Sequence, residues 1–280
     1  MEQLIGAHAG HGRWWHARAR GSICRGVIPF SELQLERYAR HIVLPEIGGA
    51  GQRRLLAARV AVVGAGGIGA GLLPWLAAAG MGRIRLVDDD IVSLSNLQRQ
   101  TLFTADDLGA PKVERAARAL GRINPDCAVE PVAVRLTAAN AALMLGGCDV
   151  VADGCDNFET RLAVADACQV LRVPLVSAAV GPFDGQLSTF RGWEAGMPCY
   201  RCLVGNDPRA IERNCADTGV LGALPGAMGA LAAVEVLREI VGFGEGLAGR
   251  LLLMDAMGMR QRTVRLAKDQ ACAGCGARVG

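Results

Sequence analysis

The segment Val60-Ala-Val-Val-Gly64-Ala-Gly66-Gly67-Ile-Gly69 decides the fold class of this 280-residue chain. Its first four residues are an apolar run with three β-branched side chains, which is typical of a buried strand. The glycines at 64, 66 and 69 have the G-x-G-x-x-G spacing of a phosphate-binding turn. An apolar stretch to about residue 79 predicts the helix that follows, which Pro74 should kink or weaken.

Strands and helices alternate beyond this segment. Strands are expected over residues 83–87, 129–134, 149–152 and 175–179, and helices over residues 111–123 and 160–171. This alternation predicts an α/β protein with a doubly wound, Rossmann-like and mostly parallel sheet. After residue 181 we expect a strand at 186–190, little periodicity over 203–220, a helix at 226–241 and a hairpin-like pair at 250–255 and 261–266. The C-terminal half of the sheet should therefore be mixed or antiparallel.

The first thirty residues differ from the rest of the chain. They contain three histidines and the Trp14-Trp15 pair, and they lack the apolar core and cleavage site of a signal peptide. We expect residues 1–30 to be a disordered extension, or the product of a wrongly chosen start codon. A single domain should follow over residues 31–280, and the capping-box spacing of Ser31 and Gln34 predicts that it opens with a helix.

Bulk composition excludes several classes of function. The net charge of +3 and the absence of a basic run argue against nucleic acid as a partner. No apolar run reaches the roughly eighteen residues that a membrane helix needs. Ten cysteines in a chain of this length do not form a secreted disulfide framework. We expect a cytoplasmic protein.

Two cysteine pairs predict a structural zinc site. Each pair has C-x-x-C spacing, and 69 residues lie between the pairs, which are Cys199 with Cys202 and Cys272 with Cys275. Four thiolates complete a tetrahedral zinc site with no open position, so the metal would hold structure together and take no part in chemistry. The alternatives are a redox C-x-x-C and two unrelated pairs.

The glycine-rich turn predicts a nucleotide site. Its glycines let the backbone approach phosphate, and Asp88, nineteen residues beyond Gly69, can accept hydrogen bonds from ribose. Dinucleotide dehydrogenases share this fingerprint, so an NAD-dependent oxidoreductase is one alternative. Against it stand the polar cluster Ser95-Asn96-Leu-Gln98-Arg99-Gln100 and Lys112, whose cations suit phosphoryl or nucleotidyl transfer unless they are solvated surface residues.

A second acidic segment follows the strand expected at 149–152. It reads Asp153-Gly-Cys-Asp156-Asn157, so its acids should lie near the carboxyl edge of the sheet, where such folds bind ligands. A carboxylate there can hold Mg²⁺ against phosphate oxygens. The alternative is that Asp156 or Asn157 caps the next helix.

Together these residues resemble the MoeB/ThiF/HesA family, the bacterial relatives of the ubiquitin-activating enzymes. The matching segments lie over residues 31–276 and are Arg37-Tyr-Ala-Arg40, Gly64-Ala-Gly-Gly-Ile-Gly69, Asp88-Asp-Asp90, Ser95-Asn-Leu-Gln-Arg-Gln-Thr101, Pro111-Lys-Val-Glu114, Ile123-Asn-Pro125, Cys155-Asp-Asn157 and the two C-x-x-C pairs. The resemblance implies that ATP adenylates the C-terminal Gly-Gly carboxylate of a ubiquitin-like sulfur carrier and releases pyrophosphate. The acyl-adenylate would then accept sulfur, in molybdopterin biosynthesis (favoured) or thiazole biosynthesis.

The resemblance also implies roles for individual residues. Asp88 would hold the ribose, Gly67 would lie against the phosphates, and Asp156 would position Mg²⁺. Asn96, Arg99 and Lys112 would contact the phosphates and their developing charge. The whole nucleotide-binding set would be Gly64, Gly66, Gly67, Gly69, Asp88, Asp90, Ser95, Asn96, Gln98, Arg99, Lys112, Asp156 and Asn157.

Further implications concern partners. Arg40 matches an arginine that family members supply from the other protomer, which implies a homodimer. Cys215 would either form a thioester or acyl-disulfide with the carrier or be an idle loop cysteine. We expect sulfur to come from a separate sulfurtransferase or cysteine desulfurase. Two other relatives remain open, a tRNA-modifying enzyme and a non-catalytic ATP-binding scaffold.

Overall fold

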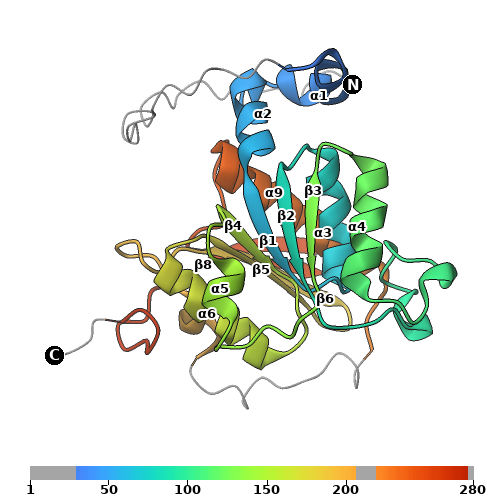
Figure 1. Ribbon diagram of the computed structural model, residues 1–280. Coiled ribbons are helices and arrows are strands. Elements are labelled where there is room, and N and C mark those ends of the chain that lie inside the picture. The colour runs from blue at the N-terminus through green and yellow to red at the C-terminus, as the bar shows by residue number, and fades with distance from the viewer. Residues whose placement is uncertain (1–29, 206–218, 277–280) are drawn as a thin grey trace, which may run out of the picture. The chain divides into compact units, whose positions relative to one another are not determined.

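An eight-stranded sheet with the order β3-β2-β1-β4-β5-β6-β7-β8 forms the centre of the structure (Figure 1). The computed structural model describes residues 30–205 and 219–276. The predicted extension, apart from Phe30, and Cys215 lie outside these residues. Two compact units meet in sequence after Arg37, and the sheet belongs to the second unit, from Tyr38 onward.

The secondary structure has these bounds. The strands are β1 (Arg59–Val63), β2 (Arg83–Val87), β3 (Ala128–Val132), β4 (Val150–Asp153), β5 (Leu175–Val180), β6 (Asp184–Phe190), β7 (Arg250–Asp255) and β8 (Arg260–Arg265). The helices are α1 (Glu32–Ile42), α2 (Gly48–Ala57), α3 (Gly67–Ala78), α4 (Lys112–Ile123), α5 (Ala141–Leu145), α6 (Phe158–Leu171), α7 (Tyr200–Val204) and α9 (Ala223–Val241). Two 3₁₀ helices, η1 (Leu94–Asn96) and η2 (Ala105–Asp107), lie between β2 and α4.

The sheet changes character along its width. Strands β3, β2, β1, β4 and β5 are parallel, and β6, β7 and β8 continue the sheet in antiparallel pairs. This confirms the predicted doubly wound sheet with an antiparallel C-terminal half. The strand order reverses at β1 and β4, and open α/β sheets bind ligands beside such a reversal, at the carboxyl ends of the strands.

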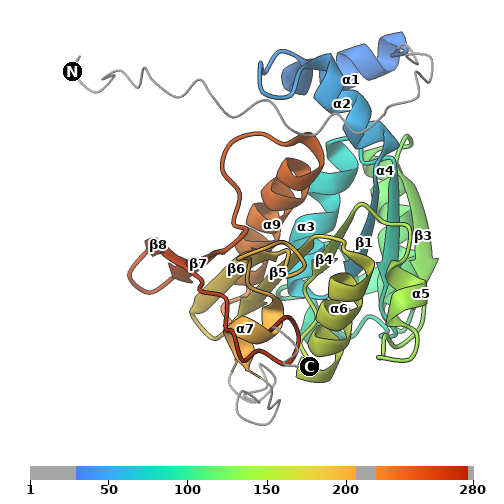
Figure 2. The ribbon, with the colours of Figure 1, turned by 90° about the vertical axis from the view of Figure 1, so that its left-hand side faces the viewer.

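Strand β1 shows how the two faces of the sheet are covered. Val60 and Val62 pack into a core with α3, α4 and α9, whereas Ala61 and Val63 pack into a second core with α5, α6 and α7. Figure 2 shows α3 and α9 on one side of these strands and α6 on the other. Because β1 is buried on both faces, it reads as a continuous apolar run and not as an alternating pattern.

The prediction did not include helix α2. Its sequence, Gly48–Ala57, begins Gly-Gly-Ala-Gly, and glycine disfavours helix by up to about 1 kcal/mol per residue relative to alanine. Tertiary contacts compensate: Leu55 is fully buried, and Arg54 Nη1 donates to the carbonyl oxygen of Val241 at the end of α9 (2.9 Å). Helix α3, by contrast, was expected and continues through Pro74 to Ala78.

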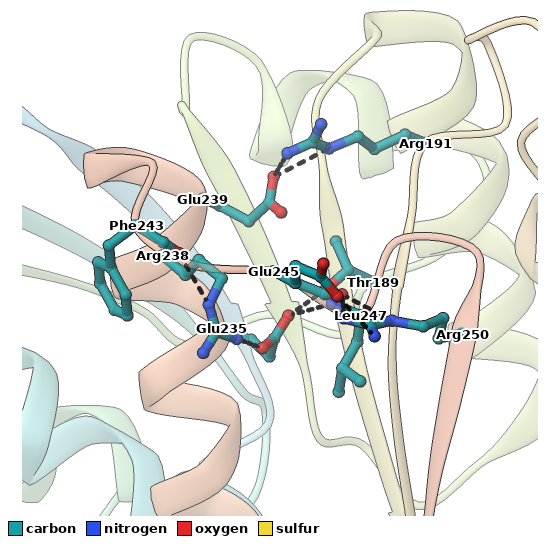
Figure 3. Close-up of polar contacts among 10 residues, drawn as sticks. Thr189, Arg191, Glu235, Arg238, Glu239, Phe243, Glu245, Leu247 and Arg250 are labelled. Carbon is teal, nitrogen blue, oxygen red and sulfur yellow. Dashed lines mark hydrogen bonds and ion pairs between the residues drawn. The ribbon is translucent and has the colours of Figure 1, made fainter. Parts of the chain in front are cut away.

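A buried carboxylate joins the long helix α9 to the antiparallel part of the sheet. Figure 3 shows Glu235 between Thr189, Arg238 and Leu247. The Thr189 hydroxyl (3.1 Å) and the Leu247 N–H (2.8 Å) both donate to Oε2 of Glu235, and Arg238 pairs with its other oxygen. A buried carboxylate with three donors has its hydrogen-bonding capacity well used, so it fixes the position of α9 against β6.

Candidate nucleotide site and cysteine cluster

A cavity of about 720 Å³ opens at the carboxyl ends of β1, β2 and β4. Most of the residues predicted to bind nucleotide line it, namely Gly64, Gly66, Gly67, Asp88, Asp90, Arg99, Lys112, Asp156 and Asn157. The predicted residues that do not line it are Gly69, Ser95, Asn96, Gln98 and Arg40, and Arg40 is exposed. The volume lies within the range of about 300–1,000 Å³ that small-molecule sites have.

Backbone geometry explains the glycines of the turn. Gly64 has φ +95°, a conformation that favours glycine over residues with a side chain. A Cβ on Gly69 would lie 2.2 Å from the carbonyl oxygen of Gly64, so only glycine lets α3 begin this close to β1. The first N–H groups of α3 have no acceptor within the helix and can bind phosphate oxygens.

Asp88, at the end of β2, ties the glycine-rich turn to the neighbouring strand. Its Oδ2 accepts the N–H of Ala65 (2.7 Å) and its Oδ1 accepts the N–H of Asp90 (2.8 Å). Burial raises the pKa of Asp88, and these two hydrogen bonds and Lys112 oppose the rise without cancelling it. Each carboxylate oxygen keeps a second lone pair, so Asp88 can shape the turn and still accept a ribose hydroxyl.

Lys112 is a buried cation at the rim of the cavity. Its side chain is 4% exposed, and Nζ lies 2.8 Å from Oδ2 of Asp90. The backbone N–H of Lys112 also donates to the carbonyl oxygen of Asp90 (3.0 Å). An ammonium group has three N–H donors, so the contact with Asp90 leaves Lys112 able to bind an anion in the cavity.

Two residues of the polar cluster after β2 face the same cavity. Arg99 Nη1 donates to the carbonyl oxygen of Ser95 (3.0 Å), which holds the guanidinium over the 3₁₀ helix η1. Gln100 is 3% exposed, and its Oε1 has no hydrogen-bond partner among the residues that the structure describes. A buried amide oxygen without a partner is unusual, and here it lies in the wall of a ligand cavity. Gln100 was quoted in the polar cluster but not expected to be a site residue.

Asn157 and Asp156, both in the acidic segment after β4, differ in what they contact. Oδ1 of Asn157 accepts the N–H of Thr160 (2.8 Å), so Asn157 is the N-cap of α6. Asp156 is exposed and lines the cavity. The helix-capping alternative thus holds for Asn157, whereas Asp156 is one of the residues that line the cavity.

A buried arginine, Arg161, lies under this segment. It binds the carbonyl oxygen of Cys155, donates to the carbonyl oxygen of Ala178 (3.0 Å) and lies 3.6 Å from Oδ2 of Asp153. Burial disfavours its charge and would lower its pKa, but Asp153, Cys155 and Tyr200 together outweigh burial, so the pKa of Arg161 is raised. Tyr200 is a further group that favours the charged form of Arg161, and it also lines the cavity. The buried guanidinium of Arg161 therefore holds the segment that carries Asp156.

The four predicted cysteines come together. Sγ of Cys199 lies 3.5 Å from that of Cys272, and Sγ of Cys202 lies 3.5 Å from that of Cys275. All four sulfur atoms lie within 4.8 Å of one another. A tetrahedral zinc ion with Zn–S distances of about 2.3 Å needs sulfur atoms about 3.8 Å apart, so this cluster fits zinc.

Two backbone groups support the sulfurs. The N–H of Asp269 donates to Sγ of Cys202, and the N–H of Gly274 donates to Sγ of Cys272, both at 3.4 Å. Such donors stabilise thiolates, which are the form that binds a metal.

Sequence reasoning missed Arg161 and Tyr200. Arg161 lies on a helix whose other residues are mostly apolar, and Tyr200 stands between two cysteines that already have a role. The only signal in the sequence was the basic residue within the first turn after the Asn157 cap. What each residue contacts depends on long-range packing of α6, β5 and α7, which spacing alone does not predict.

A glycine-rich turn, an aspartate at the end of the next strand and a buried lysine meet at one edge of a doubly wound sheet, an arrangement typical of nucleotide-binding α/β domains. Residues 38–275 match the model of the ThiF family. The chain belongs to the ThiF family.

Similar proteins agree with this assignment. The chain is 46% identical over 244 residues to the SAMP-activating enzyme E1 of Haloferax volcanii, covering 87% of this chain and 89% of that one. It is 44% identical over 248 residues to the sulfur carrier protein adenylyltransferase of Thermus thermophilus, covering 87% and 91%. It is 47% identical over 250 residues to the adenylyltransferase and sulfurtransferase MOCS3 of Bos taurus, covering 89% of this chain and 54% of that one.

Solved structures support the fold. A crystal structure of E. coli MccB with MccA-N7isoASN superposes with a TM-score of 0.75 at 24% identity, covering 86% of this chain and 75% of that one. None of the helices in the described part of the chain combines the length and hydropathy needed to span a bilayer.

Proposed function

We propose that this protein uses ATP to adenylate the C-terminal glycine carboxylate of a ubiquitin-like sulfur carrier protein. One observation carries the proposal: the cavity at the reversal of strand order brings a phosphate-binding turn, two cations and an exposed carboxylate together. Membership of the ThiF family and relatives named sulfur carrier protein adenylyltransferase support the choice of substrate.

The residues divide the work on ATP. Asp88 accepts a ribose hydroxyl, and the N–H groups at the start of α3 bind phosphate oxygens. Arg99 and Lys112 bring two positive charges to the cavity. With ATP held this way, a carboxylate oxygen of the carrier attacks the α-phosphorus, the bond to the β-phosphate oxygen breaks, and pyrophosphate leaves with the electron pair.

Fixed charges lower the barrier to this transfer. Negative charge builds up on the α-phosphate oxygens and on the leaving pyrophosphate, and preorganised cations stabilise that charge more than they stabilise bound ATP. Lys112 is already held by Asp90, so no large rearrangement is needed to aim it. Asp156 would hold Mg²⁺, which when bound neutralises phosphate charge. The exposed carboxylate of Asp156 in the cavity wall fits a hard cation.

The other assignments complete the proposal. The four-cysteine cluster would hold Zn²⁺ as a closed structural site. Arg40 would act from the partner subunit of a homodimer, and sulfur would reach the acyl-adenylate from a separate sulfurtransferase or cysteine desulfurase. We favour molybdopterin over thiazole biosynthesis and a cytoplasmic location. Cys215 lies outside the described residues, and its covalent role stays a prediction.

An exchange assay tests the reaction. Incubation with ATP, Mg²⁺, labelled pyrophosphate and a co-encoded carrier ending in Gly-Gly should move label into ATP. The same carrier without its last glycine is the control and should give none. If no such carrier supports exchange, the proposal is wrong; if NADH fluorescence titrates instead, an oxidoreductase replaces it.

A further inference from the structure

The backbone of Cys155 is held at both of its polar groups. The guanidinium of Arg161 binds its carbonyl oxygen, and its N–H donates to Oδ1 of Asp153 (3.1 Å). Nη1 of Arg161 lies 3.6 Å from Oδ2 of Asp153, so the two side chains that hold Cys155 also pair with each other. Together, Arg161 and Asp153 form a clamp on Cys155. Asp156 is the next residue, and it therefore starts from a fixed point of the backbone.

Both members of the clamp are buried, and both are tied to the neighbouring strand β5. The side chains of Arg161 and Asp153 are 10% and 1% exposed. Nη2 of Arg161 donates to the carbonyl oxygen of Ala178 (3.0 Å), and the hydroxyl of Ser177 donates to Oδ2 of Asp153 (3.3 Å). Breaking a buried ion pair leaves an uncompensated charge and is strongly destabilising, so the two side chains should stay together. The geometry of the clamp is thus set by β4, β5 and α6.

The backbone on the other side of Asp156 is fixed as well. Oδ1 of Asn157 accepts the N–H of Thr160 (2.8 Å), which makes Asn157 the N-cap of α6. Asp156 is therefore a single exposed residue between two neighbours that are held in place, and it lines the cavity. A carboxylate mounted in this way can meet a cation in the cavity with little loss of backbone freedom.

We propose that Arg161 is a positioning residue for Asp156: together with Asp153 it clamps Cys155 and so presents the next carboxylate to Mg²⁺ on bound ATP. The inference rests on the proposed function, which assigns Asp156 to Mg²⁺. Nη2 of Arg161 donates to two backbone carbonyl oxygens and Nη1 faces Asp153, so Arg161 acts through the backbone. Disturbing the clamp should reduce the gain in ATP affinity that Mg²⁺ brings and leave ATP binding without Mg²⁺ nearly unchanged.

Calorimetric titration of ATP, with and without Mg²⁺, tests this in the full chain. Arg161→Lys keeps a positive charge beside Asp153, but an ammonium group lacks the planar fork of a guanidinium and cannot hold all three partners in the same geometry. We expect the Mg²⁺-dependent gain in ATP affinity to fall roughly three- to tenfold, because a hydrogen bond that orients Asp156 is lost, while affinity without Mg²⁺ stays within about twofold. Equal losses in both titrations, or no loss, would overturn the proposal.

Arg85 on β2 offers a matched control, because it has the same kinds of partner. Its Nη1 donates to the carbonyl oxygens of Met144 (2.8 Å) and Gly146 (3.3 Å), and its Nε pairs with Glu130 (3.2 Å). None of these four residues lines the nucleotide cavity. Arg85→Lys should lower the melting temperature and leave the gain from Mg²⁺ intact. A comparable loss of that gain in Arg85→Lys would mean that general loosening explains the result, and the proposal would fall.

A double-mutant cycle tests whether the effect passes through Asp156. Asp156→Ala removes the carboxylate, and any gain from Mg²⁺ that remains comes from other groups. Adding Arg161→Lys should leave this remaining gain unchanged, because the residue that Arg161 positions is already absent. A further loss in the double variant would show that Arg161 acts by another route, which would overturn the proposal.

A second variant decides the matter if Arg161→Lys does not fold. Asp153→Asn combined with Arg161→Met removes both charges, so no buried charge is left unpaired. An asparagine side chain can still accept the N–H of Cys155, so the main loss is the contact with its carbonyl oxygen. We expect the same selective loss of the gain from Mg²⁺. An unchanged gain would overturn the proposal.

The two proposals fail differently. If the wild-type protein bound no ATP in the presence of Mg²⁺, the proposed function would fall. If the wild-type protein bound Mg²⁺ and ATP normally and Arg161→Lys did the same, the positioning role alone would fall.

Discussion

The ammonium group of Lys112 lies 2.8 Å from Oδ2 of Asp90, and the two partners differ in environment: the lysine side chain is 4% exposed and the aspartate side chain 61%. The exposed carboxylate of Asp90 therefore holds the buried ammonium group of Lys112 in place. Removing the carboxylate charge would leave the cation without its anchor at the rim of the cavity.

Asp90→Asn should lower carrier-dependent pyrophosphate exchange roughly tenfold, because the hydrogen bond that orients Lys112 loses its charge. Initial rates against ATP concentration measure the effect. Asp89→Asn is the control: Asp89 pairs at 3.4 Å with the exposed Arg135, and its loss should change the rate little. Equal defects in both variants would contradict an orienting role for Asp90.

Substitutions of two neighbouring residues after β4, Asp156 and Asn157, should affect activity and stability differently. Asn157→Ala removes the N-cap of α6 and should lower the free energy of unfolding by about 1 kcal/mol. Asp156→Ala should abolish exchange and leave urea unfolding nearly unchanged, because the exposed carboxylate caps no helix. Loss of stability in Asp156→Ala as large as in Asn157→Ala would refute this division.

Gly69→Ala should disrupt the phosphate-binding turn. Its new Cβ would lie 2.2 Å from the carbonyl oxygen of Gly64, so α3 or β1 must move, at a cost of at least about 2 kcal/mol. Gly121→Ala on α4, where no atom lies within 4 Å of the new Cβ, should instead stabilise by about 0.5–1 kcal/mol. Thermal unfolding of both variants checks the contrast; a fully stable Gly69→Ala protein would count against it.

The raised pKa of Asp88 predicts a pH-dependent contribution to stability. Burial makes the native state hold this proton more tightly than the unfolded chain, whose pKa is near 3.8. The contribution of Asp88 is therefore fully present below that value and is lost as pH rises through the folded pKa. Relative to Asp88→Asn, the wild type should lose stability over this window in urea unfolding. A difference that grows in favour of the wild type would show that the pKa is lowered instead.

Metal analysis should find about one zinc per chain if the cluster is a closed four-cysteine site. Cys272→Ser should lose the metal and lower the melting temperature, since Cys272 ties the C-terminal segment to Cys199. Cys168→Ser, a buried cysteine on α6 outside the cluster, is the control and should keep the metal. Unchanged metal content in Cys272→Ser would contradict the four-ligand assignment.

Local patterns were enough to predict much of the fold. The run at Val60–Val63, the glycine spacing and the alternation of strands with helices determine a parallel doubly wound sheet, because each signal is carried by residues adjacent in sequence. Helix α2 was missed because its glycines disfavour helix and its stability comes from packing on α9. Asp88, Asp156 and Lys112 could be predicted as site residues because Asp88 and Asp156 follow predicted strands and Lys112 opens a predicted helix.

The contacts beneath the site could not be predicted from the sequence and are seen only in the three-dimensional structure. Arg161 meets Cys155 six residues away and Ala178 seventeen residues away, and no sequence period links those positions. The pairing of Asp90 with Lys112 likewise joins residues twenty-two apart, across two 3₁₀ helices. Such pairs follow from the way α6 and α4 pack on the sheet.

The reversal of strand order at β1 and β4 has a practical consequence for engineering. The loops that follow β1, β2, β3, β4 and β5 all line the cavity at the carboxyl edge of the parallel strands, whereas the turns that enter those strands, such as the exposed one at Gly147 before β4, lie at the far edge. An affinity tag or a fluorescent reporter spliced in at Gly147 would sit a full strand length from the chemistry. A label at the far edge could therefore report on the protein without contacting the residues that line the cavity.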